Sequence, residues 1–378
     1  MQRPLRILYT IPNFDTAGSG KALLNIAQRL DRQYFEPHIL CRHDRGRFFE
    51  VVRASGIPVH LFEYTAPMTP RWQGIRKTRK ISQFLRTLKV DLIHSFHYAD
   101  DYSEPLASRW AGIRWVYTKK NMSWGANAWK ARSWLAHGIA ALNTDMINHF
   151  FKGWTKVKLI PRGVDVNEFK PDIGKRKEYR ERMQIAPHDR VIITVANLVP
   201  VKGVEVLLTA FEHVGEMFPN AHLWIVGDDS TEYAHMLKQQ ARRSPMKSRI
   251  HFMGKVMNVK DYLNAADIYV MPTLSRGCGE GFGVAMLEAM ATEKVVIGSE
   301  VSGIRDQLKN FSDHLFAPGD SKALAGQLTR WLQADVNVLE NVGKAFRQEV
   351  IQRFSIEKEV RHHQMFYEWV MRRRWRLR

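Results

Sequence analysis

Short apolar runs alternate with amphipathic stretches along the whole chain. The runs are too short for helices and are rich in β-branched and aromatic residues, so they predict buried strands. The segments between them, such as RKISQFLRTL, repeat apolar residues every three or four positions, which predicts helices. In the first half the predicted strands lie at residues 5–11, 38–41, 59–62, 91–96, 115–118 and 137–142. This alternation is typical of a doubly wound α/β domain with a largely parallel sheet.

The same rhythm restarts in the second half. Its predicted strands lie at residues 191–197, 222–227, 249–254, 267–272 and 294–299, with a long helix over 202–218. A stretch rich in Pro, Gly and charge separates the halves. We therefore predict an N-terminal domain over 1–165, a C-terminal domain over 166–354 and a final amphipathic helix with a basic end over 355–378. Ligands of such domains bind at the carboxyl ends of the strands.

Length and composition agree with two globular domains. The chain has 378 residues, of which 45% are hydrophobic and 25% charged. No apolar run approaches the ~20 residues that span a bilayer, and the N-terminus has no secretory pattern. The two cysteines, Cys41 and Cys278, match no metal spacing. We expect a cytoplasmic protein without disulfides.

The formal net charge of +19 is unevenly distributed. Residues 1–170 hold 27 Lys and Arg against 13 Asp and Glu, a balance of +14, which leaves +5 for the remainder. A basic face of this kind attracts nucleic acid, anionic lipid or an acidic substrate. It also has a simpler interpretation as a well-solvated surface.

The segment EGFGVAMLEAM, residues 280–290, has the strongest chemical signal. It follows the strand predicted at 267–272 and opens a helix. Gly281 and Gly283 let backbone N–H groups approach a ligand, and the free N–H groups of a helix start attract an anion such as a diphosphate. Glu280 lies before the helix, and Glu288 lies eight residues later among apolar neighbours. A carboxylate in that setting needs partners such as the hydroxyls of a sugar or ribose.

This segment resembles the E-x7-E motif of the retaining glycosyltransferase family 4. Three other segments are similar to that family's patterns and extend the resemblance over nearly the whole chain: IPRGVD followed by FKP (160–171), Lys202-Gly203, and AADI with a later Pro (265–272). The resemblance implies the GT-B architecture. In that architecture two Rossmann-like domains face an inter-domain cleft, and the last helix crosses back to the N-terminal domain.

The resemblance also implies roles at matching positions. Glu280 would contact the donor sugar, and Glu288 would hold the nucleotide ribose. Lys202 would bind the diphosphate and offset the charge that builds on the leaving group, while Gly18 would lie in an N-terminal loop facing that phosphate. Three backbone N–H groups would meet the sugar and phosphate, those of Phe282, Gly283 and Val284. Family members need no metal or other cofactor, and the sequence has no metal-ligand cluster.

The sequence departs from the family pattern at two positions that concern chemistry. Asn197 stands where relatives usually carry a phosphate-binding arginine, although we still expect it in the donor site, with Arg162 or Arg276 as a substitute cation. Lys120 stands where relatives often carry a histidine that points into the cleft. His97 and His94, at the end of a predicted strand, are further candidates for orienting the acceptor, or are polar strand-end residues without a role.

We therefore expect a metal-independent hexosyltransferase that moves a sugar, with retention, from a nucleotide-sugar to a glycan or lipid-linked anionic acceptor in cell-envelope polysaccharide or lipopolysaccharide assembly. The basic residues favour peripheral docking at the cytoplasmic membrane face. The alternatives are a weakly active or non-enzymatic nucleotide-sugar-binding protein of the same fold, and a nucleic-acid-binding protein. The last has only charge in its favour, since no recognition module is present.

Overall fold

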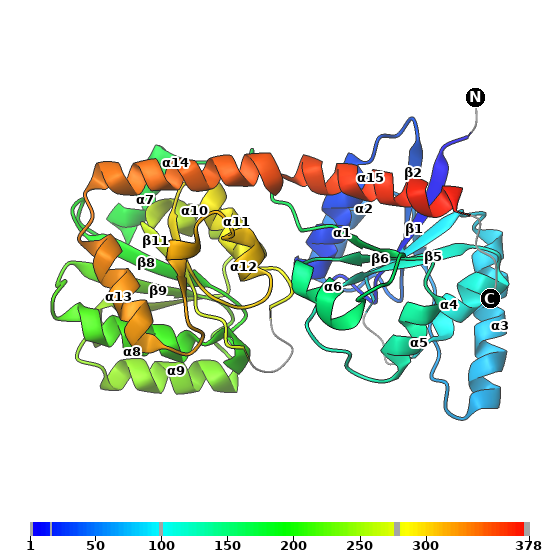
Figure 1. The fold of residues 1–378 in the computed structure, drawn as a ribbon, viewed down its shortest axis with the longest axis horizontal. Helices are drawn as coiled ribbons and strands as arrows, with labels where there is room; N and C mark the ends of the chain where they lie inside the picture. Colours follow the sequence, from blue (N-terminus) through cyan, green and yellow to red (C-terminus); the bar gives the residue numbers. More distant parts are fainter. Residues whose placement is uncertain (1–2, 16, 98–100, 276–279, 374–378) are drawn as a thin grey trace. The chain divides into compact units, whose positions relative to one another are not determined.

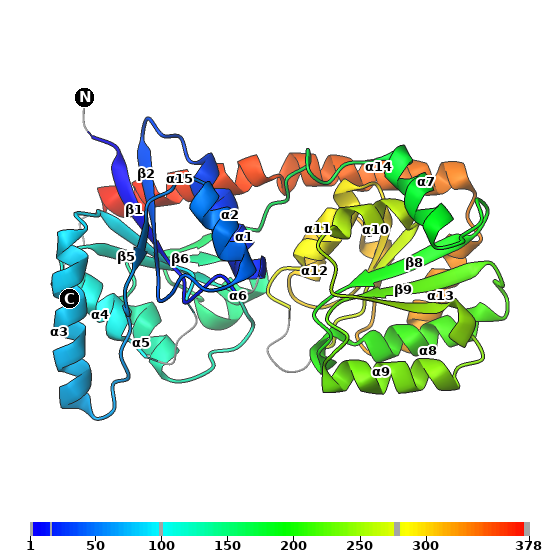
Figure 2. The ribbon, with the colours of Figure 1, turned by 180° about the vertical axis from the view of Figure 1, so that it is seen from behind.

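A computed structural model describes residues 3–15, 17–97, 101–275 and 280–373, and it divides the chain into two compact units. The N-terminal unit comprises Met1–Lys120, Trp124–Pro161 and Ile356–Arg378. The C-terminal unit comprises Asn121–Ser123 and Arg162–Ser355. Each unit is a parallel sheet covered by helices (Figures 1 and 2). No helix among the described residues is both long and apolar enough to span a bilayer.

In its described part the N-terminal unit has a seven-stranded parallel sheet with the order β3-β2-β1-β4-β5-β6-β7. Its strands are β1 (Leu5–Thr10), β2 (Phe35–Cys41), β3 (Val59–Leu61), β4 (Leu92–Ser95), β5 (Arg114–Lys119), β6 (Gly138–Ala141) and β7 (Val157–Leu159). Its helices are α1 (Ala17–Arg29), α2 (Arg47–Ala54), α3 (Arg71–Thr87), α4 (Ser103–Trp110), α5 (Ala128–Leu135), α6 (Thr144–Phe150) and α15 (Ile356–Arg372).

Successive residues of β1 point into two different cores, as strand alternation requires. Ile7 and Tyr9 pack with α1, α2 and α15 on one face, and Leu8 packs with α3, α4 and α5 on the other. Both faces are therefore buried, which explains why these strands read as continuous apolar runs.

The described C-terminal unit has a six-stranded parallel sheet with the order β10-β9-β8-β11-β12-β13. Its strands are β8 (Arg190–Val195), β9 (Ala221–Val226), β10 (Ile250–Gly254), β11 (Ile268–Met271), β12 (Val295–Ser299) and β13 (Leu315–Phe316). Its helices are α7 (Ile173–Arg182), α8 (Val204–Gly215), α9 (Glu232–Arg243), α10 (Val259–Ala265), α11 (Val284–Ala291), α12 (Ile304–Gln307), α13 (Ser321–Leu332) and α14 (Val336–Arg353), with short 3₁₀ turns η1 (Pro200–Lys202), η2 (Lys247–Arg249) and η3 (Ser312–His314).

The helix α15 belongs to the N-terminal unit, where it packs beside α1 (Figure 1). Its Tyr367 hydroxyl lies 2.7 Å from Nδ1 of His94 and 3.0 Å from the hydroxyl of Tyr9. His94 also contacts the Thr118 hydroxyl at 2.9 Å through Nε2. These polar contacts, buried among apolar side chains, fix the helix to strands β1, β4 and β5.

Two details differ from the sequence predictions. The sequence of residues 15–20, DTAGSG, is typical of a turn and predicts that the first helix begins at residue 21, but α1 begins at Ala17. Gly20 is needed for close packing, since a Cβ there would lie 2.8 Å from the Phe14 ring. Strands β7 and β13, of three and two residues, are missing from the prediction because such short segments carry no periodicity.

Candidate active site

The order of strands reverses at one point in each sheet, between β1 and β4 and between β8 and β11. In open α/β sheets ligands bind outside the carboxyl ends of the strands at such a switch point, because the connections leave the sheet in opposite directions and open a crevice. In the C-terminal unit, the loop after β8 carries Asn197 and Lys202, and the loop after β11 carries Glu280. The fold thus brings predicted donor residues from distant parts of the sequence to one sheet edge.

Lys202 and Glu280 form an ion pair at this edge. The Nζ atom of Lys202 lies 2.5 Å from Oε2 of Glu280, and the two side chains are 23% and 11% exposed. A charge-assisted contact in this half-buried setting is stronger than one in open solvent. The structure therefore juxtaposes a cation and a carboxylate that the sequence places 78 residues apart.

The backbone around Lys202 is held in place by a glycine. Gly203 has a left-handed φ of 63°, and a Cβ there would lie 2.2 Å from the carbonyl oxygen of Pro272. Pro272 directly follows β11, and the N–H of Leu274 donates to the carbonyl of Val201 at 2.8 Å. The loop of Lys202 thus lies directly against the segment that follows β11, which fixes the backbone from which the Lys202 side chain extends.

The glycine-rich start of α11 is equally close-packed. A Cβ on Gly283 would lie 2.5 Å from the sulfur of Met271, and the Gln307 side chain donates to the Gly283 carbonyl at 3.2 Å. The N–H of Val284 donates to the carbonyl of Phe282 at 2.9 Å in a tight turn. Of the three backbone donors predicted to meet sugar and phosphate, that of Val284 is thus engaged within the protein.

Glu288 lies half-buried in the second turn of α11, and sequence reasoning missed a residue whose pKa its carboxylate affects. Tyr269 of β11 is fully buried, and its pKa is raised well above the usual value by burial and then by the carboxylates of Glu288 and Glu280. The Tyr269 hydroxyl is thus within electrostatic reach of both ends of the E-x7-E motif. A tyrosine inside the otherwise aliphatic run IYVM was the signal for it in the sequence.

Asn197 lies in the same loop as Lys202, with its side chain exposed and its carbonyl accepting from the N–H of Val199 at 2.9 Å. It brings no charge to the site. Arg162 is buried, with a side chain 6% exposed, and Arg276 lies outside the described residues. Lys202 is therefore the cation that the described loops after β8 and β11 place beside Glu280.

The switch point of the N-terminal unit gathers the other predicted residues. Lys120 follows β5, and its ammonium group donates to the carbonyl of Phe96 at 2.7 Å and to the Ser19 hydroxyl at 3.2 Å. Gly18 is exposed in the first turn of α1, with open space where a Cβ would stand. Lys120 thus connects the start of α1 with the segment after β4, where His97 lies.

His97 and His94 differ in their surroundings. His97 is 5% exposed, and its Nδ1 has no hydrogen-bond partner among the described residues. Burial, followed by the charges of Arg132, Arg42 and Lys120, lowers its pKa to about 2, so the ring is neutral. His94 is fully buried in the contacts with α15, which gives it a structural role and leaves His97 as the histidine at the sheet edge.

A buried ion pair supports this edge and was not predicted. Arg132 of α5 and Glu104 of α4 lie 2.9 Å apart, with side chains 0% and 1% exposed. Glu104 also accepts from the hydroxyls of Thr10 at 2.5 Å and Ser95 at 2.9 Å, the last residues of β1 and β4. The pair therefore holds together the ends of the two strands between which the order reverses.

Two Rossmann-like parallel-sheet units, each with polar and charged groups at its switch point, are the architecture expected of the GT-B class of glycosyltransferases. Comparison with protein families is consistent with this class in both units. The family model described as Glycosyltransferase Family 4 matches residues 16–168, and the one described as Glycosyl transferases group 1 matches residues 175–349. The chain belongs to glycosyltransferase family 4.

Individual relatives and solved structures match this chain at low sequence identity. A phosphatidyl-myo-inositol mannosyltransferase of Mycobacterium leprae is 29% identical over 285 residues, which cover 74% of this chain but only 64% of that relative. A glycosyltransferase structure from Rickettsia africae matches with a TM-score of 0.86 at 18% identity, over 99% of this chain and 100% of the other. Anabaena Alr3699/HepE in complex with UDP-glucose matches with a TM-score of 0.81 at 21% identity, over 97% and 99%. At these identities the structural matches show the fold.

Proposed function

We propose that this chain is a retaining, metal-independent glycosyltransferase that transfers a hexose from a nucleotide-diphosphate-sugar. The observation that carries the proposal is the Lys202–Glu280 pair at the switch point between β8 and β11, at the start of the glycine-rich turn into α11. The named ligand of a structural neighbour, UDP-glucose in Anabaena Alr3699/HepE, supports a nucleotide-sugar as the donor. The family membership supports transfer as the reaction.

The ion pair suggests how the donor is received. An incoming diphosphate competes for the ammonium of Lys202, and the released Glu280 carboxylate then accepts from sugar hydroxyls. Glu288 accepts from the ribose, and N–H groups of the turn before α11 contact the sugar and phosphate. Lys202 then stabilises the charge that builds on the departing diphosphate, as preorganised cations and dipoles do in transition states.

For retention we propose same-face attack, in which the acceptor oxygen approaches the face from which the diphosphate leaves. The bond between the anomeric carbon and the phosphate oxygen breaks, the bond to the acceptor oxygen forms, and the acceptor proton passes to the leaving phosphate. In the N-terminal unit, neutral His97 and the cation Lys120 orient the acceptor. The charge that this mechanism needs comes from Lys202, so no metal or other cofactor is invoked.

Asn197 favours a second candidate, a nucleotide-sugar-binding protein with little or no turnover. Its exposed amide replaces a cation in the donor loop. In enzymes that stabilise an oxyanion, removal of one hydrogen-bond donor lowers kcat roughly 10²- to 10³-fold. A screen of UDP-, GDP- and ADP-sugars for slow hydrolysis without acceptor separates the two. Turnover of one donor supports the transferase, whereas tight binding of a donor that is never hydrolysed or transferred supports the binding protein.

The acceptor side of the proposal rests on charge. Helix α3 has five basic residues in its first ten, namely Arg71, Arg76, Lys77, Arg79 and Lys80, and Trp72 among them is 64% exposed. Arg372 and Arg373 extend the basic character at the end of α15, and the further arginines of the tail and Trp375 lie outside the described residues. Basic residues near anionic lipid gain about 1 kcal/mol each. This supports a lipid-linked or otherwise anionic acceptor, used in cell-envelope glycan assembly at the cytoplasmic membrane face.

Liposome co-sedimentation tests the membrane part. Binding is expected with anionic vesicles, to fade with salt, and to weaken when residues 371–378 are removed. Neutral vesicles are the control. Retention of the protein in the supernatant with anionic vesicles at low salt would show that it does not dock on lipid.

A further inference from the structure

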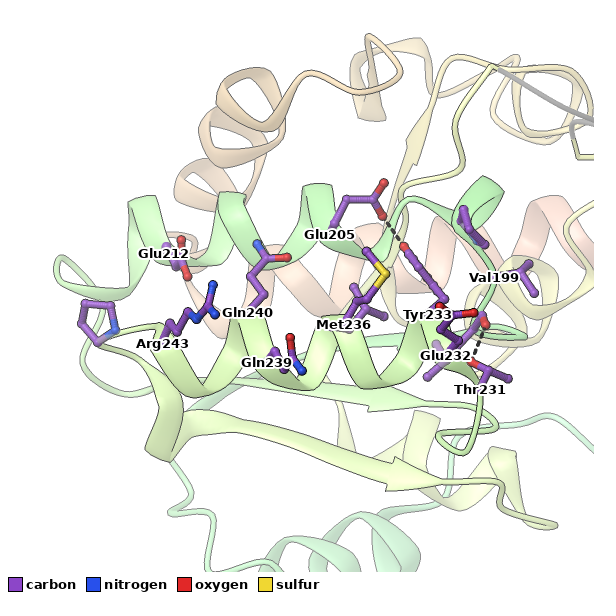
Figure 3. A pocket seen from close by; sticks show the side chains of 14 residues that line it. Val199, Glu205, Glu212, Thr231, Glu232, Tyr233, Met236, Gln239, Gln240 and Arg243 are labelled. Atoms are coloured by element: carbon purple, nitrogen blue, oxygen red, sulfur yellow. Dashed lines mark hydrogen bonds between the residues drawn. The ribbon is translucent and has the colours of Figure 1, made fainter.

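A groove of about 960 Å³ lies between helices α8 and α9 of the C-terminal unit (Figure 3). It extends from Val199 and Thr231 at the start of the helices to Glu212 and Arg243 near their ends. Lys202, Glu280 and Glu288 do not line it. The groove is thus a separate surface, although one end is formed by the loop that carries Lys202.

The groove combines an apolar surface with acidic groups. Met236 is 61% and Val199 39% exposed, and both share one groove with Leu198 and Leu237. Three carboxylates line it against one cation, namely those of Glu205, Glu212 and Glu232 against Arg243. In a chain of net charge +19 this groove is locally acidic.

Hydrogen bonds between the two helices and their loops define the shape of the groove. The buried Tyr233 donates its hydroxyl to the Glu205 carboxylate (Figure 3). The Thr231 hydroxyl donates to the carbonyl of Leu198 at 3.0 Å, and the Gln240 amide donates to the Thr209 hydroxyl at 3.2 Å. The groove is therefore a preformed surface, which lowers the cost of binding.

The charge of the groove restricts what can occupy it. Two such grooves would repel one another, so the groove does not pair with itself across a two-fold axis. A complementary occupant has an apolar anchor flanked by cations. Helix α3 has this composition, since its 17 residues, RWQGIRKTRKISQFLRT, include no acidic residue. Trp72 is 64% and Ile75 38% exposed.

The exposed residues of α3 are also arranged correctly. Gly74, Thr78, Ile81 and Leu85 face the interior of the N-terminal unit. Trp72, Ile75, Arg76 and Arg79 follow the spacing i, i+3, i+4 and i+7, which places them together on one face of the helix. When an amphipathic helix binds in a groove between two other helices, the residues at these positions make the contacts.

We propose that the α8–α9 groove binds helix α3 of a second copy of this chain. Trp72 and Ile75 cover the apolar floor around Met236 and Leu237, and Arg76 and Arg79 lie against the acidic rim. Because the two surfaces are different, the contact is heterologous. This contact uses the same helix as the proposed lipid docking, so anionic vesicles should compete with it. Self-association is therefore measured without lipid, and each proposal can then be refuted without the other.

Analytical ultracentrifugation of the full chain tests the proposal. The wild-type protein is expected to self-associate at low salt and to dissociate as salt is added. A groove variant (Glu212→Lys, Glu232→Lys) and a helix variant (Arg76→Glu, Arg79→Glu) are each expected to associate on the order of tenfold more weakly or worse, a loss of about 1.4 kcal/mol. A mixture of the two variants is expected to associate again, because each reversed surface then meets an opposite charge.

The matched control carries the same charge change on exposed residues of α7 and α14, Glu181→Lys and Glu340→Lys. It is expected to associate like the wild type, and all variants to keep their thermal unfolding midpoint. A wild-type protein that stays monomeric at every concentration at low salt would overturn the proposal. So would a groove variant that associates like the wild type, a mixture that does not recover, or a groove that binds an unrelated basic peptide while the chain remains monomeric.

Discussion

Lys202 and Glu280 hold opposite charges 2.5 Å apart at an edge where the sheet opens, with 23% and 11% of their side chains exposed. Neither charge is fully hydrated, so each depends on the other until a ligand arrives. Removal of one partner from a pair that is largely buried leaves an uncompensated charge and costs a few kcal/mol. In the proposed donor site, the Lys202 ammonium can therefore exchange its Glu280 partner for a diphosphate.

Alanine at the two ends of the E-x7-E motif should separate binding from turnover. Glu288→Ala is expected to weaken nucleotide binding about 10- to 100-fold, the value of a lost charge-assisted hydrogen bond of roughly 1.5–3 kcal/mol. Glu280→Ala is expected mainly to slow turnover. Isothermal titration and initial rates measure both, with the exposed Glu300→Ala as the control. Unchanged affinity and rate in both variants would remove these residues from the site.

Lys202→Ala should affect phosphate more than nucleoside. Its charge matters most as the diphosphate departs, so transfer is expected to slow more than nucleoside binding weakens. The measurement compares the affinities of UDP and uridine, or GDP and guanosine, in wild type and variant. The exposed Lys322→Ala serves as the control. Equal losses for nucleoside and diphosphate would show that Lys202 does not touch phosphate.

His97 should make the fold sensitive to acid. Its pKa in the folded protein, about 2, is lower than the ~6.5 of an unfolded histidine. The stabilisation of the neutral ring is thus complete above pH ~6.5 and is lost as the pH falls below that value. Between pH 7 and pH 4, His97→Gln is expected to lose about 3 kcal/mol less of its free energy of unfolding, measured in urea, than the wild type loses. The exposed His235→Gln should match the wild type, and parallel profiles for His97→Gln and wild type would refute the assignment.

At the scale of elements, periodicity predicted the long strands and most helices because both faces of each sheet are buried. The sequence predicted the start of α1 too late, because Gly18 and Gly20 are typical of a loop although they belong to the first turn of the helix. Of the groups missed at the proposed site, Tyr269 had a signal as the one aromatic residue of the run IYVM, whereas the Arg132–Glu104 pair has no sequence pattern. Charged residues in helices are usually solvated, and only the packing of α4 against α5 buries these two.

Helix α15 offers a prediction at this scale. The Tyr367 hydroxyl contacts His94 and Tyr9 inside the core of the N-terminal unit. Tyr367→Phe keeps the ring but removes the hydroxyl that His94 and Tyr9 contact, so the free energy of unfolding should fall by about 1–3 kcal/mol. Urea denaturation measures it, with Tyr34→Phe, a tyrosine 58% exposed, as the control. An unchanged unfolding free energy in Tyr367→Phe would mean that this hydroxyl does not hold α15.

For the whole molecule, the E-x7-E motif with its accompanying segments predicted the family and the GT-B fold, which the family models and structural matches confirm. The sequence also predicted the asymmetry of charge, with +14 of +19 in the first 170 residues. It could not predict the acidic groove, because Glu205, Glu212 and Glu232 are ordinary surface residues until α8 and α9 place them around Met236. Surface chemistry of this kind arises from tertiary packing and has no local signature.

The anomeric configuration of the product tests the central claim most directly. The experiment uses the donor that the hydrolysis screen identifies and an acceptor for that donor. NMR of the transfer product, formed in the presence of EDTA, reports the configuration of the new linkage. We predict that the transferred sugar keeps the configuration of the donor and that EDTA leaves the rate unchanged. A product of inverted configuration, or a rate that requires added Mg²⁺ or Mn²⁺, would contradict the account.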